Sequence, residues 1–199
     1  MIETFERLVV CLARLPGIGR RTAERMVVRL VRDPEQGITR ELLACLKDLQ
    51  DQARLCSRCG GLTESCRDPC SQCTDPRRDS HTLCIVGQPG DVEQLESSGA
   101  FRGRYHILNA RLSPMRGEGL AHLQTDRLAI RLDQEPIEEV ILALDTDSES
   151  DATAAYLKEW LSPRKLRVSR LAFGLPTGSG IAYTDSLTLA RALDGRREL

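Results

Sequence analysis

Cysteine spacing constrains this chain of 199 residues more than any other feature. Cys56-x-x-Cys59 is followed, after a short loop, by Cys70-x-x-Cys73. Two such pairs are a strong zinc signature, because each pair holds one side of a tetrahedral ion and four thiolates complete its shell. A complete shell leaves no position for a reacting water, so the spacing predicts one structural zinc ion per chain. A looser pair, Cys66-x-x-x-Cys70, is an alternative, and unligated thiols or a disulfide are a further one.

Composition indicates a folded chain with an uneven distribution of charge. Apolar residues make up 41%, charged residues 29%, and the net charge is −1. Residues 7–32 hold seven arginines and one acid, whereas residues 135–159 hold eight acids and one base. No stretch approaches the roughly 20 apolar residues of a membrane span, and the N-terminus lacks a signal-peptide pattern. We therefore expect a cytoplasmic protein without a membrane partner, in which cysteines bind metal more often than they form disulfides. The remaining cysteines lie on apolar faces and are expected in the core: Cys11, Cys45 and Cys84.

Apolar residues at helical spacing predict helices in the first part of the chain. The first runs to Pro16, the second is capped by Thr22 and ends near Asp33, and the third begins at about Thr39. The third helix is expected to turn its leucines inward: Leu42, Leu43, Leu46 and Leu49.

From residue 83 onwards, short apolar runs alternate with helical patterns, which is typical of a mostly parallel sheet covered by helices. Strands are expected at 83–86, 105–108, 140–144 and 168–173. Helices are expected at 91–98, along a segment through 155–161, and at 185–193.

The segment Leu15–Ala23, between the first two helices, looks like a helix-hairpin-helix DNA-binding element. Its glycines allow a sharp turn, and the N–H groups that begin the second helix favour an anion. Nearby arginines add phosphate contacts, which position a protein on DNA without reading sequence. The alternative is an ordinary helical hairpin with a solvated basic face. The predicted DNA-binding residues are Gly17, Ile18, Gly19, Arg20, Arg21, Arg25 and Arg29.

Acids alternate with small polar residues just past the expected strand 140–144, at the strand end where α/β sheets place their sites. They are Asp145, Asp147, Glu149 and Asp151. The pattern resembles the acidic motif of Toprim domains and suits Mg²⁺. The alternative is a solvated loop in which Ser150 or Asp151 caps the next helix. Toprim enzymes also carry a proton-transferring Glu after the first strand, and Gly87 stands there in this chain. The loop is thus expected to bind Mg²⁺ or a partner, but not to catalyse a reaction.

The order of these features resembles the RecR family of recombination mediators over nearly the whole chain. The resemblance implies a multidomain α+β protein. Its parts are a helix-hairpin-helix domain (1–54), a four-Cys zinc finger (55–78), a Toprim α/β domain with a mostly parallel sheet (79–174) and a C-terminal segment with a helix (175–199). The stretches that carry the resemblance are Cys73–Asp79, Tyr105–Leu108, Leu112–Gly119, Asp151–Leu157, Gly174–Gly178 and Thr188–Arg196.

The resemblance also implies a function. The chain would be a bacterial DNA-binding mediator, not an enzyme, that is associated with the nucleoid during repair. With RecO and RecF it would help load RecA on gapped or single-stranded DNA. It would form a dimer or a ring-like tetramer through N-terminal and C-terminal contacts, with Arg21 and Arg25 lining the hole.

This chain departs from the family pattern at Gly87, at Ser148–Asp151, in a longer zinc loop that contains Cys66, and across 119–135. Two other functions therefore stay open. One is a Mg²⁺-dependent Toprim nuclease or nicking enzyme, and the other is an adaptor that binds only proteins. The sequence does not decide the oligomer size or a preference for single-stranded over double-stranded DNA.

Overall fold

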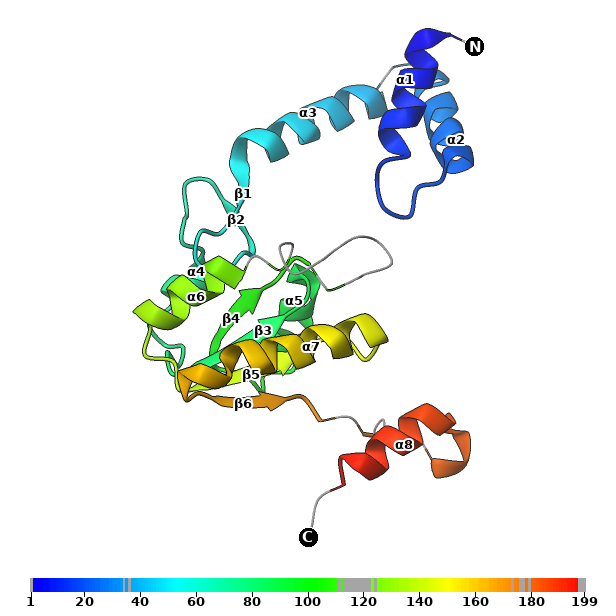
Figure 1. Ribbon diagram of the computed structural model, residues 1–199. Helices are drawn as coiled ribbons and strands as arrows, with labels where there is room; N and C mark the ends of the chain where they lie inside the picture. The colour runs from blue at the N-terminus through cyan, green and yellow to red at the C-terminus, as the bar shows by residue number, and fades with distance from the viewer. Residues whose placement is uncertain are drawn as a thin grey trace. The chain divides into compact units, whose positions relative to one another are not determined.

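The computed structural model describes residues 2–33, 35, 37–110, 112, 123, 125–172, 174–175, 178 and 180–196. The chain divides into two compact units, Met1–Arg54 and Leu55–Leu199 (Figure 1). Among the described residues, no helix is both long enough and apolar enough to cross a membrane.

The first unit contains the helices α1 (Glu3–Leu12), α2 (Arg20–Val31) and α3 (Gly37–Gln52). Apolar residues at helical spacing bring α1 and α2 together. The buried side chains of this small core are Val9, Ala23 and Val27, and those packed against it are Phe5, Leu12 and Ile18.

The prediction that Thr22 caps the second helix is wrong. Helix α2 begins at Arg20, and its cap is Gly19, which has extended backbone and no side chain to accept a hydrogen bond. Gly17, at φ 79°, turns the chain so sharply that the helix can begin early. The first helical bond then runs from the Ala23 N–H to the Gly19 carbonyl at 3.0 Å.

The inward orientation predicted for the α3 leucines is also wrong, although the helix itself is confirmed. Helix α3 has no buried residue, and the exposed fractions of Leu42, Leu43, Leu46 and Leu49 are 43%, 64%, 57% and 61%. The helical spacing of apolar residues correctly identified one face of α3. The described core of this unit, however, lies between α1 and α2. Cys11 and Cys45 are likewise exposed, and of the three cysteines expected in the core only Cys84 is buried.

The second unit is built on a four-stranded parallel sheet of order β4-β3-β5-β6 (Figure 1). The strands are β3 (Thr82–Val86), β4 (Arg104–Ile107), β5 (Glu139–Ala143) and β6 (Arg167–Arg170). In the register, Cys84 lies opposite Tyr105 on one side and Ile141 on the other. The mostly parallel sheet predicted from the alternating pattern is confirmed.

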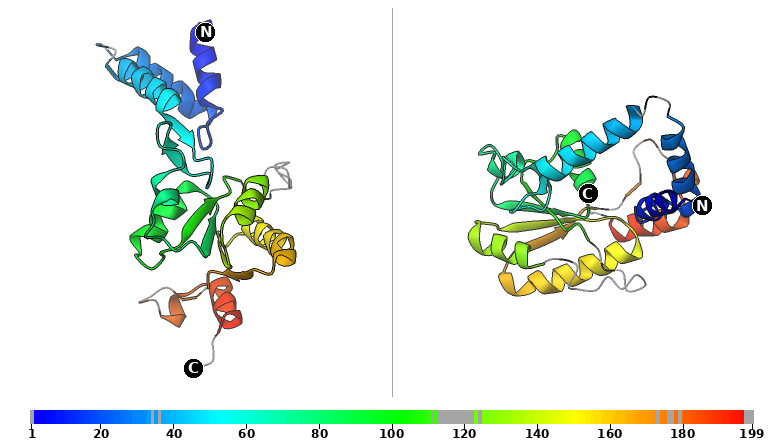
Figure 2. Two further views of the ribbon diagram at one scale, coloured as in Figure 1. Left: turned by 90° about the vertical axis from the view of Figure 1, so that its left-hand side faces the viewer. Right: turned by 90° about the horizontal axis from the view of Figure 1, so that it is seen from above.

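Helices cover both faces of this sheet, as Figure 2 shows. The helices are α5 (Pro89–Ser97), α6 (Thr125–Gln134) and α7 (Ser148–Leu161). Alternate residues of a strand point to opposite faces. Accordingly, Leu83 and Ile85 pack in one cluster with α6 and α7, whereas Cys84 and Val86 pack in another with α5. Helix α6 was not predicted from the sequence.

Shorter elements surround the sheet. They are β1 (Ala53–Leu55), which precedes the short β2 (Leu62–Glu64) in a two-stranded sheet, α4 (Ser71–Thr74), the 3-10 turns Ser162–Arg164 and Ile181–Tyr183, and α8 (Ser186–Asp194). The side chain of Asp185 caps α8 by accepting a hydrogen bond from the Thr188 N–H at 2.9 Å. Much of the stretch Leu112–Gly119, and parts of Gly174–Gly178, lie outside the described residues.

Candidate metal centre and nucleic-acid interface

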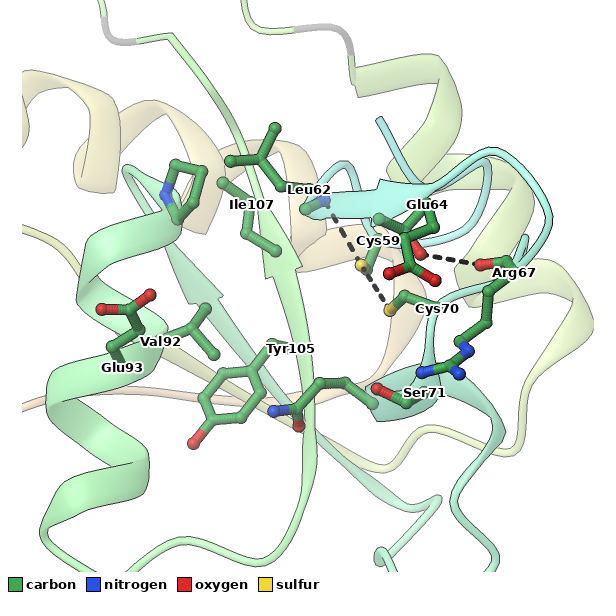
Figure 3. A pocket seen from close by; sticks show the side chains of 14 residues that line it. Cys59, Leu62, Glu64, Arg67, Cys70, Ser71, Val92, Glu93, Tyr105 and Ile107 are labelled. Atoms are coloured by element: carbon green, nitrogen blue, oxygen red, sulfur yellow. Dashed lines mark hydrogen bonds between the residues drawn. The ribbon is translucent and has the colours of Figure 1, made fainter. Parts of the chain in front are cut away.

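The predicted zinc ligands lie together in the second unit. The Sγ atoms of Cys56, Cys59, Cys70 and Cys73 lie within 4.8 Å of one another, and all four residues are buried. Cys59 and Cys70 are 3.6 Å apart at sulfur, a pair visible in Figure 3, and Cys56 and Cys73 are 4.0 Å apart. Four sulfurs at about 2.3 Å from a tetrahedral zinc ion lie about 3.8 Å from one another. The cluster therefore has the dimensions of a four-thiolate metal site.

Backbone geometry fixes the first cysteine pair. The Cys56 N–H donates to the Gly61 carbonyl at 2.7 Å, and the Gly60 N–H donates to the Cys56 carbonyl at 3.0 Å. Gly60 has φ 77°, and a Cβ there would lie 2.7 Å from the carbonyl oxygen of Ile107, so the turn requires glycine. The Gly61 N–H also points at the Cys59 sulfur at 3.4 Å, and such a donor favours the thiolate.

Shared hydrogen bonds shift the pKa values of the clustered thiols in opposite directions. The hydrogen bond shared with Cys70 raises the pKa of Cys59 to about 12, while the same bond lowers the pKa of Cys70 to about 2. Hydrogen bonds with Cys59 and Cys70 also raise the pKa of Cys73. A thiophilic divalent ion would allow all four sulfurs to be deprotonated.

Cys66 lies apart from this cluster. It is exposed, and its thiol faces the carboxylate of Glu64 at 3.8 Å. The structure therefore brings together the two matched pairs and leaves out Cys66, so the alternative pairing of Cys66 with Cys70 is not formed.

The α1–α2 turn places the predicted DNA-contacting residues in the first unit. The Ile18 N–H donates to the Leu15 carbonyl at 3.1 Å and closes the turn. Since Gly19 offers no capping side chain, the first N–H groups of α2 point out of the helix without a side-chain acceptor from the cap. An uncapped helix N-terminus favours an anion.

The arginines of α2 differ in their partners. Arg20 pairs with Glu6 at 2.6 Å and with Glu24 at 3.2 Å, so its charge is largely compensated. Arg21, Arg25 and Arg29 are exposed. Together with Arg32, which the sequence analysis did not single out, they line one hollow on the hairpin.

The predicted acidic loop follows β5. Asp145 and Asp147 are exposed, whereas Glu149 is half-buried in the first turn of α7. Asp147 caps α7 by accepting a hydrogen bond from the Ser150 N–H at 2.8 Å, so the alternative cap at Ser150 or Asp151 was wrong. The carboxylate of Asp151 instead forms ion pairs with two arginines, Arg170 of β6 at 2.7 Å and Arg191 of α8 at 3.1 Å.

Gly87 lies at the end of β3, near this loop in the fold, and its carbonyl accepts from the Asn109 N–H at 3.0 Å. A Cβ at Gly87 would make only an ordinary contact, 3.5 Å from Asp91, so a side chain has room there. Within the described part of the chain, the four cysteines are the only group of three or more His, Cys, Asp or Glu residues whose ligand atoms come this close together. The acids of the loop do not form such a group.

Comparison with known proteins decides the family. Residues 5–49 match the helix-hairpin-helix of RecR, residues 81–172 match a Toprim domain, and residues 174–197 match the C-terminal part of RecR. The chain is 45% identical over 197 residues to recombination protein RecR of Anaeromyxobacter sp. (strain Fw109-5), which covers 99% of this chain and 98% of that protein. It is 45% identical over 196 residues to recombination protein RecR of Syntrophotalea carbinolica, which covers 98% and 97%. It is 42% identical over 194 residues to recombination protein RecR of Bifidobacterium longum subsp. infantis, which covers 98% and 96%.

The chain belongs to the RecR family. The resemblance inferred from the sequence is thereby confirmed. The fold predicted with it, a helix-hairpin-helix, a four-Cys cluster and a Toprim domain with a parallel sheet, is confirmed as well. Membership of this family of recombination proteins gives the chain a role in recombinational repair.

In this RecR-family chain, hydrogen bonds that the sequence analysis missed connect the Cys cluster to the Toprim sheet. The Ile107 N–H of β4 donates to the Cys59 carbonyl at 2.7 Å, which continues the sheet into the cluster. The Asn109 side chain donates to the Gly60 carbonyl at 2.6 Å. On the other side of the cluster, Arg58 donates to the Cys73 carbonyl at 3.3 Å. A metal ion held by the four cysteines would therefore be coupled to the order of β4.

A carboxylate whose side chain is only 9% exposed joins the same parts of the Toprim domain. Glu135, just after α6, accepts from Arg131 at 2.9 Å and from Arg104 at 2.8 Å, and it lies 3.7 Å from Arg58. Burial alone would raise the pKa of Glu135, but the hydrogen bonds and charges of Arg104 and Arg131 outweigh it and lower the pKa. The Arg131 side chain is 1% exposed and also donates to the Tyr105 carbonyl. The i, i+4 spacing of Arg131 and Glu135 was the available signal in the sequence.

A second polar contact lies on the α5 face. The Tyr105 hydroxyl donates to Glu96 at 2.6 Å, and Glu96 also pairs with Arg78, whose guanidinium lies 5.5 Å from the Tyr105 ring centre. Burial, followed by the bond to Glu96, raises the pKa of Tyr105 above its ordinary value, so the hydroxyl stays protonated at neutral pH. Beside Tyr105 is a hollow of about 320 Å³, with Val92 of α5 among its lining residues (Figure 3).

Proposed function

We propose that this chain is a non-catalytic recombination mediator that holds DNA through the α1–α2 hairpin without reading its sequence. The observation that carries the proposal is the combination of an uncapped α2 N-terminus with exposed arginines along the same helix. The contacting residues would be the backbone of Gly17, Ile18 and Gly19 and the side chains of Arg21, Arg25 and Arg29, with Arg20 nearest the turn. Such contacts neutralise phosphates and release counterions, so binding should weaken steeply as salt rises.

The Cys cluster is proposed to hold one structural zinc ion per chain, with Cys56, Cys59, Cys70 and Cys73 as ligands. Four thiolates fill the coordination shell, so the ion would stabilise the fold and offer no place to a substrate. Metal analysis of the purified protein should give about one zinc per chain. Within the second unit, we assign the zinc finger to 55–78, the Toprim domain to 79–174 and the C-terminal segment to 175–199.

The Toprim domain is proposed to bind the partner proteins RecO and RecF and so to help load RecA on gapped or single-stranded DNA. Support comes from the exposed acids at the carboxyl end of the sheet, Asp145 and Asp147. An exposed acidic edge complements a basic protein surface and steers its association.

We further propose that the chain forms a dimer or a ring-like tetramer. Exposed apolar side chains support contacts at both ends of the chain. In the first unit they are Leu43, Leu46 and Leu49 of α3, and near the C-terminus they are Ile181, Tyr183, Leu187 and Leu193. A ring with Arg21 and Arg25 toward its hole would retain DNA without tight individual contacts, because encirclement keeps the local concentration high.

The DNA-binding proposal is tested with the double variant Arg21→Glu and Arg25→Glu. We expect its affinity for DNA to fall about tenfold or more at low salt and the salt dependence to become shallower, because phosphate contacts are lost. Arg40→Glu in α3 is the matched control, since it reverses an exposed charge in the same unit away from the turn. Unchanged affinity in a double variant with a normal circular-dichroism spectrum would exclude the hairpin as the DNA site.

The non-catalytic assignment is tested by incubating the protein with plasmid DNA and Mg²⁺. We expect intact DNA, because Gly87 supplies no proton-transfer group and Asp151 already pairs with two arginines. Cutting that Asp147→Asn abolishes would instead identify a Mg²⁺-dependent Toprim nuclease.

A further inference from the structure

We propose that the α1–α2 hairpin takes one unpaired nucleotide of single-stranded DNA, with its phosphate on a wall of arginines and its base against Phe5. The inference rests on the proposed DNA-binding function. It adds that this surface distinguishes single-stranded from double-stranded DNA. Two adjoining hollows on the hairpin carry the argument.

The first hollow is basic and has a volume of about 690 Å³. Arginines from one face of α2 line it, and they recur at intervals of three or four residues: Arg21, Arg25, Arg29 and Arg32. Each interval of four residues advances about 6 Å along the helix. The guanidinium groups can therefore follow a phosphate backbone that runs along α2.

The charges of this hollow are available to a ligand. Across the described residues, Arg21, Arg25, Arg29 and Arg32 form no ion pair, and all four are exposed. The carboxylate in the hollow is Glu24, and it pairs with Arg20 at 3.2 Å. The hollow thus keeps a positive potential, which attracts an anion.

The second hollow is apolar and has a volume of about 430 Å³. It is lined mainly by aliphatic side chains and one ring: Ile2, Phe5, Leu8, Val27, Val28 and Val31. Phe5, Val28 and Arg32 line both hollows, so the apolar surface begins where the basic wall ends. Both volumes fall in the range of small-molecule sites, about 300–1,000 Å³.

This juxtaposition matches the chemistry of an unpaired nucleotide. A free phosphate would use the arginines but not the apolar surface, and a purely apolar partner would leave four positive charges unpaired. A nucleotide has an anionic end and a flat base, and bases stack on aromatic side chains where a basic groove follows the backbone. Bases in a duplex are already paired and stacked, so a duplex would reach the arginines alone. The surface should therefore favour single-stranded over double-stranded DNA.

The test compares Phe5→Leu with the wild-type chain, by fluorescence anisotropy on a thymidine oligonucleotide and on a duplex of equal length. Leucine keeps the small core filled but removes the ring. We expect single-strand affinity to fall about 5- to 100-fold, the range for loss of one stacked base, and duplex affinity to stay within about twofold. Val31→Ser, at a side chain that is 76% exposed, should act in the same direction without touching the core. Val10→Ser is the matched control, because Val10 is an exposed valine of α1 outside both hollows.

A second readout locates the base directly. Photo-cross-linking with an oligonucleotide that carries 5-iodouracil should label Phe5, which lies in the short tryptic peptide that ends at Arg7. Labels found only outside α1 and α2 would overturn the inference. So would equal losses on single strand and duplex in Phe5→Leu, especially if light scattering showed a changed oligomer, because the face would then be a protein contact.

The two proposals fail separately. If the Arg21→Glu and Arg25→Glu double variant loses affinity for both forms of DNA but Phe5→Leu loses it for neither, the hairpin is a DNA site without a base pocket. If the double variant keeps its full affinity for both forms, the proposed DNA-binding function itself is wrong.

Discussion

Two sets of arginines, one in each unit, lie in opposite surroundings. In the second unit, Arg131 is 1% exposed and donates to Glu135 and to a backbone carbonyl, and Arg78 pairs with Glu96. In the first unit, Arg21 and Arg25 are exposed and form no ion pair among the described residues. A paired, buried arginine contributes to one specific fold, whereas an unpaired, exposed one is available to a ligand.

Apolar side chains show the same contrast. The sheet of the second unit buries Leu83, Ile85 and Leu142 within one cluster that includes α7. Helix α3 of the first unit leaves Leu43 and Leu46 exposed. The sheet of the second unit thus has a core of its own, whereas α3 of the first unit presents apolar surface that another molecule would cover.

Removal of a zinc ligand should have the largest effect, and it should destabilise the second unit and not the first. Cys56→Ser should lower the free energy of unfolding of the second unit by about 5 kcal/mol or more, because structural metal binding is coupled to folding. The single tryptophan, Trp160, lies in α7 and packs against the core, so its fluorescence during urea unfolding reports on this unit. DNA contacts of the α1–α2 hairpin should persist.

Cys66→Ser is the control, since Cys66 is exposed and lies outside the cluster. Its stability and zinc content should match those of the wild type. Full zinc and full stability in Cys56→Ser would show that the ligand set is wrong.

The next effect concerns the buried arginine. Arg131→Met should destabilise the second unit by about 3 kcal/mol, because Glu135 keeps its charge but loses its most buried partner. The equivalent change in the first unit, Arg25→Met, should alter stability by less than about 0.5 kcal/mol and weaken DNA binding instead. Urea unfolding and fluorescence anisotropy measure the two effects. Similar losses of stability in both variants would remove the contrast between the units.

Much of this architecture could be predicted because the signals are local. Cysteine spacing identifies the cluster, and the run 140–144 identifies a buried strand whatever its neighbours are. The turn at Gly17 marks the hairpin, because few other residues adopt its positive φ of 79°. Even so, assignment of the metal, the DNA contacts and the acidic loop stays a prediction until it is tested.

The sequence-based predictions that failed concern the contacts of individual side chains. The period of α3 shows an apolar face, but nothing local tells whether that face meets the same chain. Helix α6 was missed because a buried arginine, Arg131, interrupts its apolar pattern, and one of the partners that satisfy it is the distant Tyr105 carbonyl. Asp147 looked like a metal ligand and is also the α7 cap, a role set by backbone geometry at the end of β5.

A change in pH should alter the stability of the second unit through His106, which is buried there. Burial, with help from Arg131 and Arg127, lowers the pKa of His106 to about 3, below an unfolded value of about 6.5. The unfolded chain therefore takes up a proton below about pH 6.5 that the folded chain does not, so stability falls as the pH falls. At pH 5 this loss is on the order of 2 kcal/mol.

His106→Leu should lack this loss. The difference in unfolding free energy between the wild type and His106→Leu, measured from pH 7.5 to pH 5, should shift in favour of the variant as the pH falls. Other titrating groups cancel in that difference. A difference that is independent of pH would mean that His106 is protonated equally in both states.

The smallest effect on stability should come from the exposed leucines of α3. Leu43→Gln with Leu46→Gln should change the unfolding free energy of the dilute protein by less than about 0.5 kcal/mol, because side chains that are 64% and 57% exposed lose little apolar contact. Circular dichroism during urea unfolding measures this, with Lys47→Gln on the same helix as the control. The mass in solution should nevertheless fall in light scattering, because the removed surface is apolar and contiguous along the helix. A loss above about 1 kcal/mol at a concentration where the chain is monomeric would instead place these leucines in the folded core of the first unit, and α3 would then not be a surface that another molecule covers.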